Sequence, residues 1–207
     1  MPQYPAFHLK LIRSCVVGLC SLTGVVYGKA VLPAKSVLPM AQTQTYAITQ
    51  GVCTFQAVGN PGFLRINGEG GKPTGSWILE GKKTLKEAQI HMPLASFVTG
   101  IEKRDEHMHQ KYLESTKYPE AVLKVPQFSW NTDKLPEKVD LPASLTLHGV
   151  TKPVTVSVTL KEQGKDIVAT SDFTLLLSDF SIEIPSFAGL TVAKDVTVHV
   201  ELTAAGK

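Results

Sequence analysis

Charged and imidazole side chains are concentrated in one short segment of the chain, residues 103–109 (KRDEHMH). His107, His109 and Glu106 are residue types that ligate metal ions. On a helix, residues two positions apart point about 200° away from each other, so these two imidazoles do not converge as an i, i+4 pair does. We therefore expect no metal site here. An enzyme or metalloprotein that uses His107, His109 and Asp105 is the alternative.

Arg104 and Asp105 are adjacent opposite charges with His107 two positions further on. Half-buried charges need partners, so we expect Arg104 and Asp105 to form a structural pair that pins a helix across the fold, with His107 hydrogen-bonded nearby. A second possibility is that Arg104 or His107 lies at the mouth of a pocket and contacts the polar head of a ligand.

Motifs for other chemistries are missing from the sequence. There is no Gly-x-Ser-x-Gly, no P-loop, no Cys-x-x-Cys-His and no dinucleotide fingerprint. His91, His148 and His199 fall on separate predicted strands. We predict no catalytic residue, no metal and no cofactor.

One helix is expected among the elements that position these residues. Thr99-x-x-Glu102 has the spacing of a capping box, and Met108 and Tyr112 share a helix face at i, i+4. Pro119 restricts the preceding residue to an extended conformation and ends the segment. We predict a single short helix around residues 103–113, inserted between strands.

The rest of the chain alternates between apolar and polar residues with a period of two, which is typical of strands with one buried face. Short strands separated by turn residues predict an antiparallel sandwich or barrel. Strands are expected at residues 45–50, 52–57, 63–68, 74–80, 86–92, 121–130, 139–148, 153–162, 167–177 and 193–202.

A β-hairpin is predicted over residues 145–158 (LTLHGVTKPVTVSV). Its two halves alternate, and the segment 148–153 supplies the Gly and Pro that a reversal needs. We expect Leu145, Leu147, Val154, Val156 and Val158 to point inward, and His148 to have no catalytic role.

Three segments resemble the YceI-like family of lipocalin-like, lipid-binding proteins: residues 145–158, 103–120 (KRDEHMHQKYLESTKYPE) and 177–187 (LSDFSIEIPSF). The second is similar to the family's Arg-Asp-x-His-(Leu/Met) motif followed by Tyr-Pro. The residues that match are Arg104, Asp105, His107, Met108, Tyr118 and Pro119. Tyr112-Leu113 stand where the family usually has Phe-Phe, and the first strands match least well.

The resemblance implies an all-β fold, an eight-stranded antiparallel lipocalin-like barrel with an elongated apolar interior. Such a barrel has room for side chains or for one slender ligand. Family members hold polyisoprenoids or similar long-chain lipids. The expected lining residues are Phe55, Trp77, Leu79, Phe97, Phe128, Leu147, Phe173, Leu175, Phe180 and Phe187.

The N-terminal part of the chain reads as a targeting segment. In residues 1–28, Lys10 and Arg13 precede an apolar stretch too short to span a bilayer comfortably, which predicts a cleavable signal peptide cut between residues 28 and 41. Residues 29–44 are predicted to be a linker and 45–204 a YceI-like barrel domain. The protein is then periplasmic or secreted; an uncleaved membrane anchor is the alternative.

The charge of the chain resides largely in this segment. The full chain carries 21 basic and 18 acidic residues, a net of +3; without residues 1–28 the basic residues number 19, a net of +1. The domain has no basic excess that favours nucleic acid. Only Cys53 lies beyond the predicted signal peptide, and it is expected to be a small core residue.

These observations predict a non-catalytic protein that sequesters or transports a long-chain apolar lipid, a polyisoprenoid or an isoprenoid quinone, inside the barrel. Transient membrane contact and a homodimer are compatible with this function. The alternative is an exported stress-response or interaction barrel with a filled core and a protein partner. A continuous internal tunnel would favour the carrier and a packed interior would favour the alternative.

Overall fold

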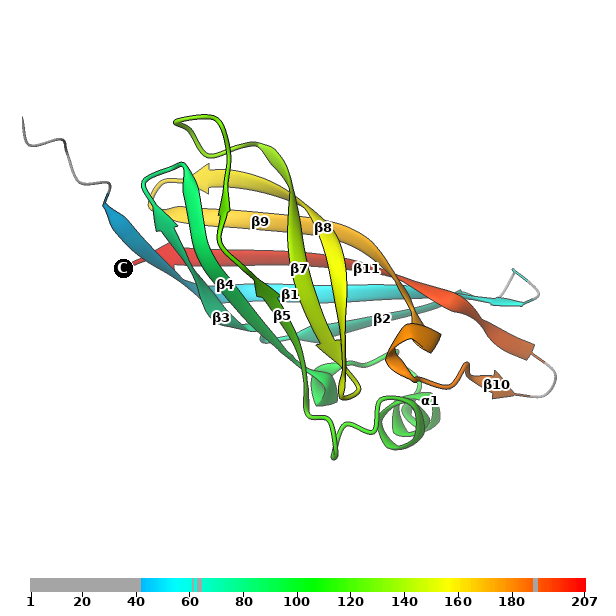
Figure 1. Ribbon diagram of the computed structural model, residues 1–207. Coiled ribbons are helices and arrows are strands. Elements are labelled where there is room, and N and C mark those ends of the chain that lie inside the picture. The colour runs from blue at the N-terminus through cyan, green and yellow to red at the C-terminus, as the bar shows by residue number, and fades with distance from the viewer. Residues whose placement is uncertain (1–41, 61, 63–64, 188–189) are drawn as a thin grey trace, which may run out of the picture. The chain divides into compact units, whose positions relative to one another are not determined.

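Antiparallel strands make up most of the structure, a computed structural model that describes residues 42–60, 62, 65–187 and 190–207 (Figure 1). The elements are β1 (Thr43–Asn60), β2 (Arg65–Gly71), β3 (Thr74–Glu80), β4 (Thr84–Pro93), η1 (Leu94–Ser96), α1 (Glu102–His107), η2 (Met108–Tyr112), β5 (Glu120–Val125), β6 (Phe128–Ser129), β7 (Lys138–Leu147), β8 (Val150–Gln163), β9 (Asp166–Leu176), η3 (Leu177–Phe180), β10 (Ser186–Phe187) and β11 (Leu190–Gly206). The predicted signal peptide, its cleavage region and most of the predicted linker lie outside the described residues.

The sheet closes on itself, because β1 pairs with β11 as well as with β3. The ring of staves runs β1–β3–β4–β5–β7–β8–β9–β11 and back to β1. The predicted eight-stranded antiparallel barrel is therefore confirmed. β2 and β3 lie end to end along the same edge of β1. Val58 of β1 is opposite Arg65 of β2, and Thr43 of β1 is opposite Glu80 of β3, so the two pairings have the same register.

Two predicted strand boundaries were wrong. The strands expected at residues 45–50 and 52–57 form one strand, β1, which absorbs Gly51 and a register irregularity between Ile48 and Gln50. The strand expected at residues 121–130 is broken into β5 and β6 around Pro126, because proline offers no N–H to a neighbouring strand.

The β7–β8 hairpin is tighter than predicted. Its turn consists of His148 (φ 51°) and Gly149 (φ 75°) alone, and two successive positive φ values are those of a type I′ turn. Pro153, expected in the turn, lies in β8 opposite Ser144. The twist of a type I′ turn matches that of the strands, so no longer reversal is needed.

The predicted short helix is present as α1, which continues into a π-helical turn, η2. The predicted capping box is wrong: the helix begins two residues later than that motif requires, with Ile101 as its N-cap and no side-chain cap. Among the described residues, no helix has the length and apolar character needed to cross a membrane.

Apolar side chains gather in two clusters inside the barrel. One includes Trp77, Leu85 and Trp130, and the other includes Met92 and Phe97. The first cluster includes residues that flank the β3–β4 turn and residues near the end of β11, and the second includes residues of η1 and packs against residues of η2. Figure 1 shows the β3–β4 turn and the C-terminus at one end of the barrel and α1 at the other. In the described part of the chain no polar or charged residue is buried, so both packed clusters are apolar.

Glycines of β2 leave room for two aromatic rings. A Cβ added to Gly68 would lie 2.3 Å from the Phe55 ring, and one added to Gly70 would lie 2.8 Å from the Phe97 ring. The two rings pack edge to face with centroids 5.7 Å apart. The backbone of β2 is therefore part of the surface that holds this pair.

Replacing Gly70 by alanine should destabilise the protein, because the new methyl group displaces the Phe97 ring. We expect a loss of about 1–3 kcal/mol in the free energy of unfolding, the usual cost of overpacking. Gly71→Ala is the matched control, since a Cβ there meets nothing within 4 Å. Urea unfolding measures both variants, and equal stabilities would contradict the packing argument.

Candidate functional site

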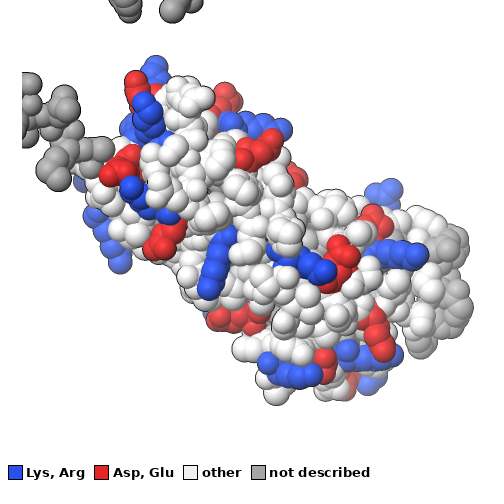
Figure 2. All heavy atoms as spheres, viewed as in Figure 1, with Lys and Arg blue, Asp and Glu red and all other residues white. Residues whose placement is uncertain are grey.

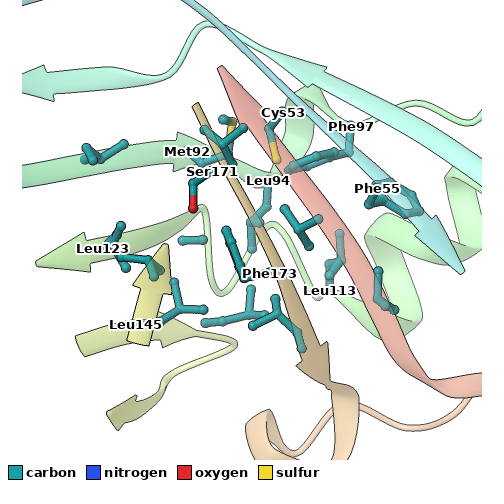
Figure 3. Close-up of a pocket in the computed structure, with 18 of the residues that line it drawn as sticks. Cys53, Phe55, Met92, Leu94, Phe97, Leu113, Leu123, Leu145, Ser171 and Phe173 are labelled. Atoms are coloured by element: carbon teal, nitrogen blue, oxygen red, sulfur yellow. The ribbon is translucent and has the colours of Figure 1, made fainter. Parts of the chain in front are cut away.

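A cavity of about 1000 Å³ lies inside the barrel (Figure 3). Each of the eight barrel strands contributes side chains to its wall. The alternation along β9 shows how the sequence builds it: Ile167, Ala169, Ser171, Phe173 and Leu175 line the cavity, whereas the intervening residues do not. Because every second residue of a strand points to the same side, the alternating sequence gives a continuous inner surface.

The far end of the cavity is closed by buried side chains. Trp130 lies on the wall with 9% of its surface exposed, and its indole N–H donates to the carbonyl oxygens of Lys82 (2.6 Å) and Lys134 (3.1 Å). Leu85 and Ile167 beside it are 5% and 3% exposed. This end forms the floor, defined here by Trp130, Leu85 and Ile167.

The end near α1 is open and carries positive charge. Four basic side chains lie on the wall there: Lys103, Arg104, His107 and Lys111. No Asp or Glu is among the described lining residues, although Lys103 pairs with Glu106 outside the wall (2.5 Å). Ile101, also on the wall, is 53% exposed. We call this end the mouth.

Arg104 and Asp105 both contact Thr99. Arg104 Nε donates to the Thr99 hydroxyl (2.7 Å) and Nη2 to the Thr99 carbonyl (2.9 Å), while the Thr99 N–H donates to Asp105 Oδ1 (2.8 Å) and the hydroxyl donates there too. The predicted direct pair is instead bridged by Thr99. This arrangement ties the start of α1 to the preceding loop and leaves Arg104 on the cavity wall.

The electrostatics of this network favour an ionised carboxylate. Desolvation raises the pKa of Asp105, but hydrogen bonds from the Thr99 side chain and backbone, the Arg104 charge and the Gly100 N–H outweigh it, so the pKa is lowered. Deeper in the cavity the balance is reversed, since burial raises the pKa of the Cys53 thiol to about 11. Cys53 is thus a neutral apolar wall residue, as predicted for a small core residue.

Of the ten lining residues expected from the sequence, seven lie on the cavity wall: Phe55, Trp77, Leu79, Phe97, Leu147, Phe173 and Leu175. Phe128 lies off it, half-buried in the short β6 that follows the break at Pro126. Phe180 lies off it too, buried in η3. Phe187 belongs to β10, but its side chain is outside the description.

Arg104 and His107, the possible contacts for a polar head, both reach the cavity, and Asp105 does not. Sequence reasoning missed Lys103, Lys111 and Ser171. Lysines are usually assigned to the solvent-exposed surface. The rotation of α1 and η2 about the helix axis, which brings these two lysines to the mouth, depends on how the helix packs against the barrel. The inward position of Ser171 was available from the alternation of β9, although its polarity argued against it.

Three histidines on or next to strands each contact a carboxylate. His91 Nδ1 lies 2.9 Å from Glu120, His148 Nε2 lies 2.7 Å from Glu114, and His199 Nδ1 lies 2.6 Å from Asp172. Within the described ranges, no three His, Cys, Asp or Glu side chains are grouped so as to hold a metal ion. His148 also reaches the Phe180 carbonyl (3.2 Å), a contact between the hairpin turn and η3.

Known proteins share this sequence pattern. A UPF0312 protein from Pseudomonas syringae pv. tomato is 33% identical over 125 residues, which are 56% of this chain and 62% of the relative. A UPF0312 protein from Pseudomonas putida strain KT2440 is 32% identical over 133 residues, 60% of this chain and 66% of the relative. The match thus spans less than two thirds of the length of these curated relatives.

Solved structures share the fold. A polyisoprenoid binding domain from Saccharophagus degradans, implicated in plant cell wall breakdown, superposes with a TM-score of 0.64 at 20% identity, covering 81% of this chain and 99% of that one. Burkholderia cenocepacia BcnA gives 0.61 at 19% identity, covering 74% and 96%. The YceI-like domain matches residues 46–204. The chain therefore belongs to the YceI-like family.

Proposed function

We propose that this protein binds a long-chain apolar lipid, a polyisoprenoid or an isoprenoid quinone, inside the barrel and sequesters or transports it without catalysis. The observation that carries the proposal is the apolar cavity of about 1000 Å³, which is lined by exposed side chains at the mouth and by buried side chains at the floor. A single slender chain suits this space, and no polar residues are needed along its length.

Burial of the tail supplies the binding energy. Each methylene group removed from water contributes about 0.8 kcal/mol, so a long chain binds tightly by contact with side chains such as Leu123, Leu145 and Phe173 alone. The polyisoprenoid-binding neighbour from Saccharophagus degradans supports the same ligand class by fold likeness.

The polar head is assigned to the mouth. Lys103, Arg104 and Lys111 offer N–H donors and positive charge, and His107 offers a ring N–H, which suit a head group with acceptor oxygens. Arg104 is oriented by its two hydrogen bonds to Thr99, so it points to the cavity before any ligand arrives. The ligand then lies with its tail toward Trp130 and its head near α1.

The alternative functions, a filled-core interaction barrel and an enzyme or metalloprotein, have less support than the lipid carrier. A filled-core interaction barrel is disfavoured by the cavity itself. For the enzyme or metalloprotein alternative, His107 lies on the wall, whereas His109 is not among the described lining residues. On the face drawn in Figure 2, basic and acidic side chains are interspersed, which gives a nucleic-acid partner no support.

The location and partners form part of the proposal. The basic residues and apolar stretch of residues 1–28 support export to the periplasm or the medium. Transfer of a lipid requires transient contact with a membrane, and a homodimer is compatible with the family resemblance.

The direct test is mass spectrometry of an organic extract of the protein purified from cells. We expect a stoichiometric lipid with a long apolar chain. A lipid-free protein that also fails to take up prenyl chains in solution would falsify the proposal.

Filling the middle of the cavity should weaken lipid binding without unfolding the barrel. Ser171 lies on the wall, so Ser171→Phe places a ring where the tail must pass, and we expect prenyl-chain affinity to fall at least tenfold. Thr174→Phe adds the same ring on the exposed outer face of β9 and should bind normally. Fluorescence titration measures both, and normal binding by the inner variant would contradict an internal site.

Removing positive charge at the mouth should weaken the binding of lipids with an anionic head group and leave the binding of neutral lipids unchanged. For Lys103→Gln with Lys111→Gln, we expect a prenyl phosphate to bind a few-fold less tightly, about 0.2–1 kcal/mol per charge, while the corresponding prenol is unaffected. Lys82→Gln with Lys83→Gln, in the turn between β3 and β4, is the control pair. An equal loss for phosphate and alcohol would place the head elsewhere.

The Cys53 thiol should react slowly with iodoacetamide. Because the pKa of Cys53 is about 11, the fraction present as thiolate, the reactive form, is on the order of a hundredfold smaller at pH 8 than for an ordinary cysteine. The rate of labelling should rise as the pH approaches 11. Site-resolved peptide mass spectrometry follows Cys53 alone, with the urea-unfolded chain as control. Bound prenyl chains should slow labelling further; fast labelling at pH 8 would show an accessible thiol.

A further inference from the structure

Trp130, at the floor of the cavity, is held in place by hydrogen bonds. Three hydrogen bonds hold Trp130: the two from its indole N–H and one from its backbone N–H to the Lys83 carbonyl (3.1 Å). The acceptors belong to the β3–β4 turn and to the loop that follows β6. The ring is therefore fixed from two separate segments of the chain.

The side chains that cluster with Trp130 are buried as well. Leu85, Leu141 and Ile167 belong to the same buried cluster and are 3–6% exposed. Leu135, from the loop before β7, also reaches the wall. A tail that enters at the mouth and runs the length of the barrel meets this floor.

We propose that Trp130 sets the maximum chain length of the lipid that the barrel accommodates. The inference rests on the proposed function, because it requires a tail that enters from the mouth. Each added prenyl unit is buried until the tail reaches the indole. Beyond that length a further unit has to stay in water at the mouth, where it gains no burial.

Ala169 provides an independent way to move this limit. It lies on the wall two residues along β9 from Ile167, so it forms the next layer above the floor. A large side chain at Ala169 raises the floor, whereas a smaller side chain at Trp130 lowers it. The two substitutions should therefore shift the length limit in opposite directions.

The experiment measures affinities for a series of linear prenols of increasing length, by competition against a fluorescent prenyl probe. For the unchanged chain, we expect affinity to rise by about tenfold or more per prenyl unit and then to stop rising at a limiting length. Trp130→Leu should move this limit up by at least one unit and Ala169→Phe should move it down. Thr170→Phe, off the cavity wall on the same strand, should leave it unchanged.

The outcomes separate the inference from the proposed function. If prenols of every length fail to bind the unchanged chain, the carrier proposal fails and the inference with it. If prenols bind but the limit stays at the same length in folded Trp130→Leu, the carrier stands and the role of Trp130 is refuted. Where the loss of the indole hydrogen bonds unfolds Trp130→Leu, Ala169→Phe still tests the position of the floor, because an unchanged limit in that variant would refute a tail that ends at Trp130.

Discussion

The pairing of β1 with β11 is the interaction on which the rest of the structure depends. An open sheet with the same alternation would expose one apolar face to water, whereas closure turns that face into an interior surface shared by eight staves. β1 meets this requirement by its length: it pairs with β11 along one edge and with β2 and β3 along the other. A container follows directly from this closure.

The two ends of the container differ because different segments close them. At the floor, strand-connecting turns bring in Trp130, whose hydrogen bonds are satisfied by backbone carbonyls. At the mouth, the long connection between β4 and β5 carries α1 and η2, and their basic side chains reach the cavity. The interior is therefore polarised along its axis, apolar at the floor and cationic at the mouth, which is the polarity of an amphiphilic lipid.

Prediction succeeded where a single local rule decides the outcome. The period of two identified the staves and placed Phe173 and Leu175 on the wall, because side-chain direction in a strand alternates strictly. Prediction failed where the position of a side chain depends on its contacts with other parts of the chain. Phe128 lies off the wall because Pro126 interrupts the strand before it, and Thr99 contacts Asp105 and Arg104 instead of capping the helix. Lys103 and Lys111 were missed because their direction follows from how the helix packs.

The sequence by itself determined the family, the all-β barrel, the inserted helix and most of the apolar wall, since these depend on residue type and spacing along the chain. Only the tertiary structure decided that the interior is hollow, which end is open and which residue closes the other. Volume and direction depend on how side chains from distant strands meet: Trp130 acquires its place from the carbonyls of Lys82 and Lys134, and no local pattern encodes that encounter.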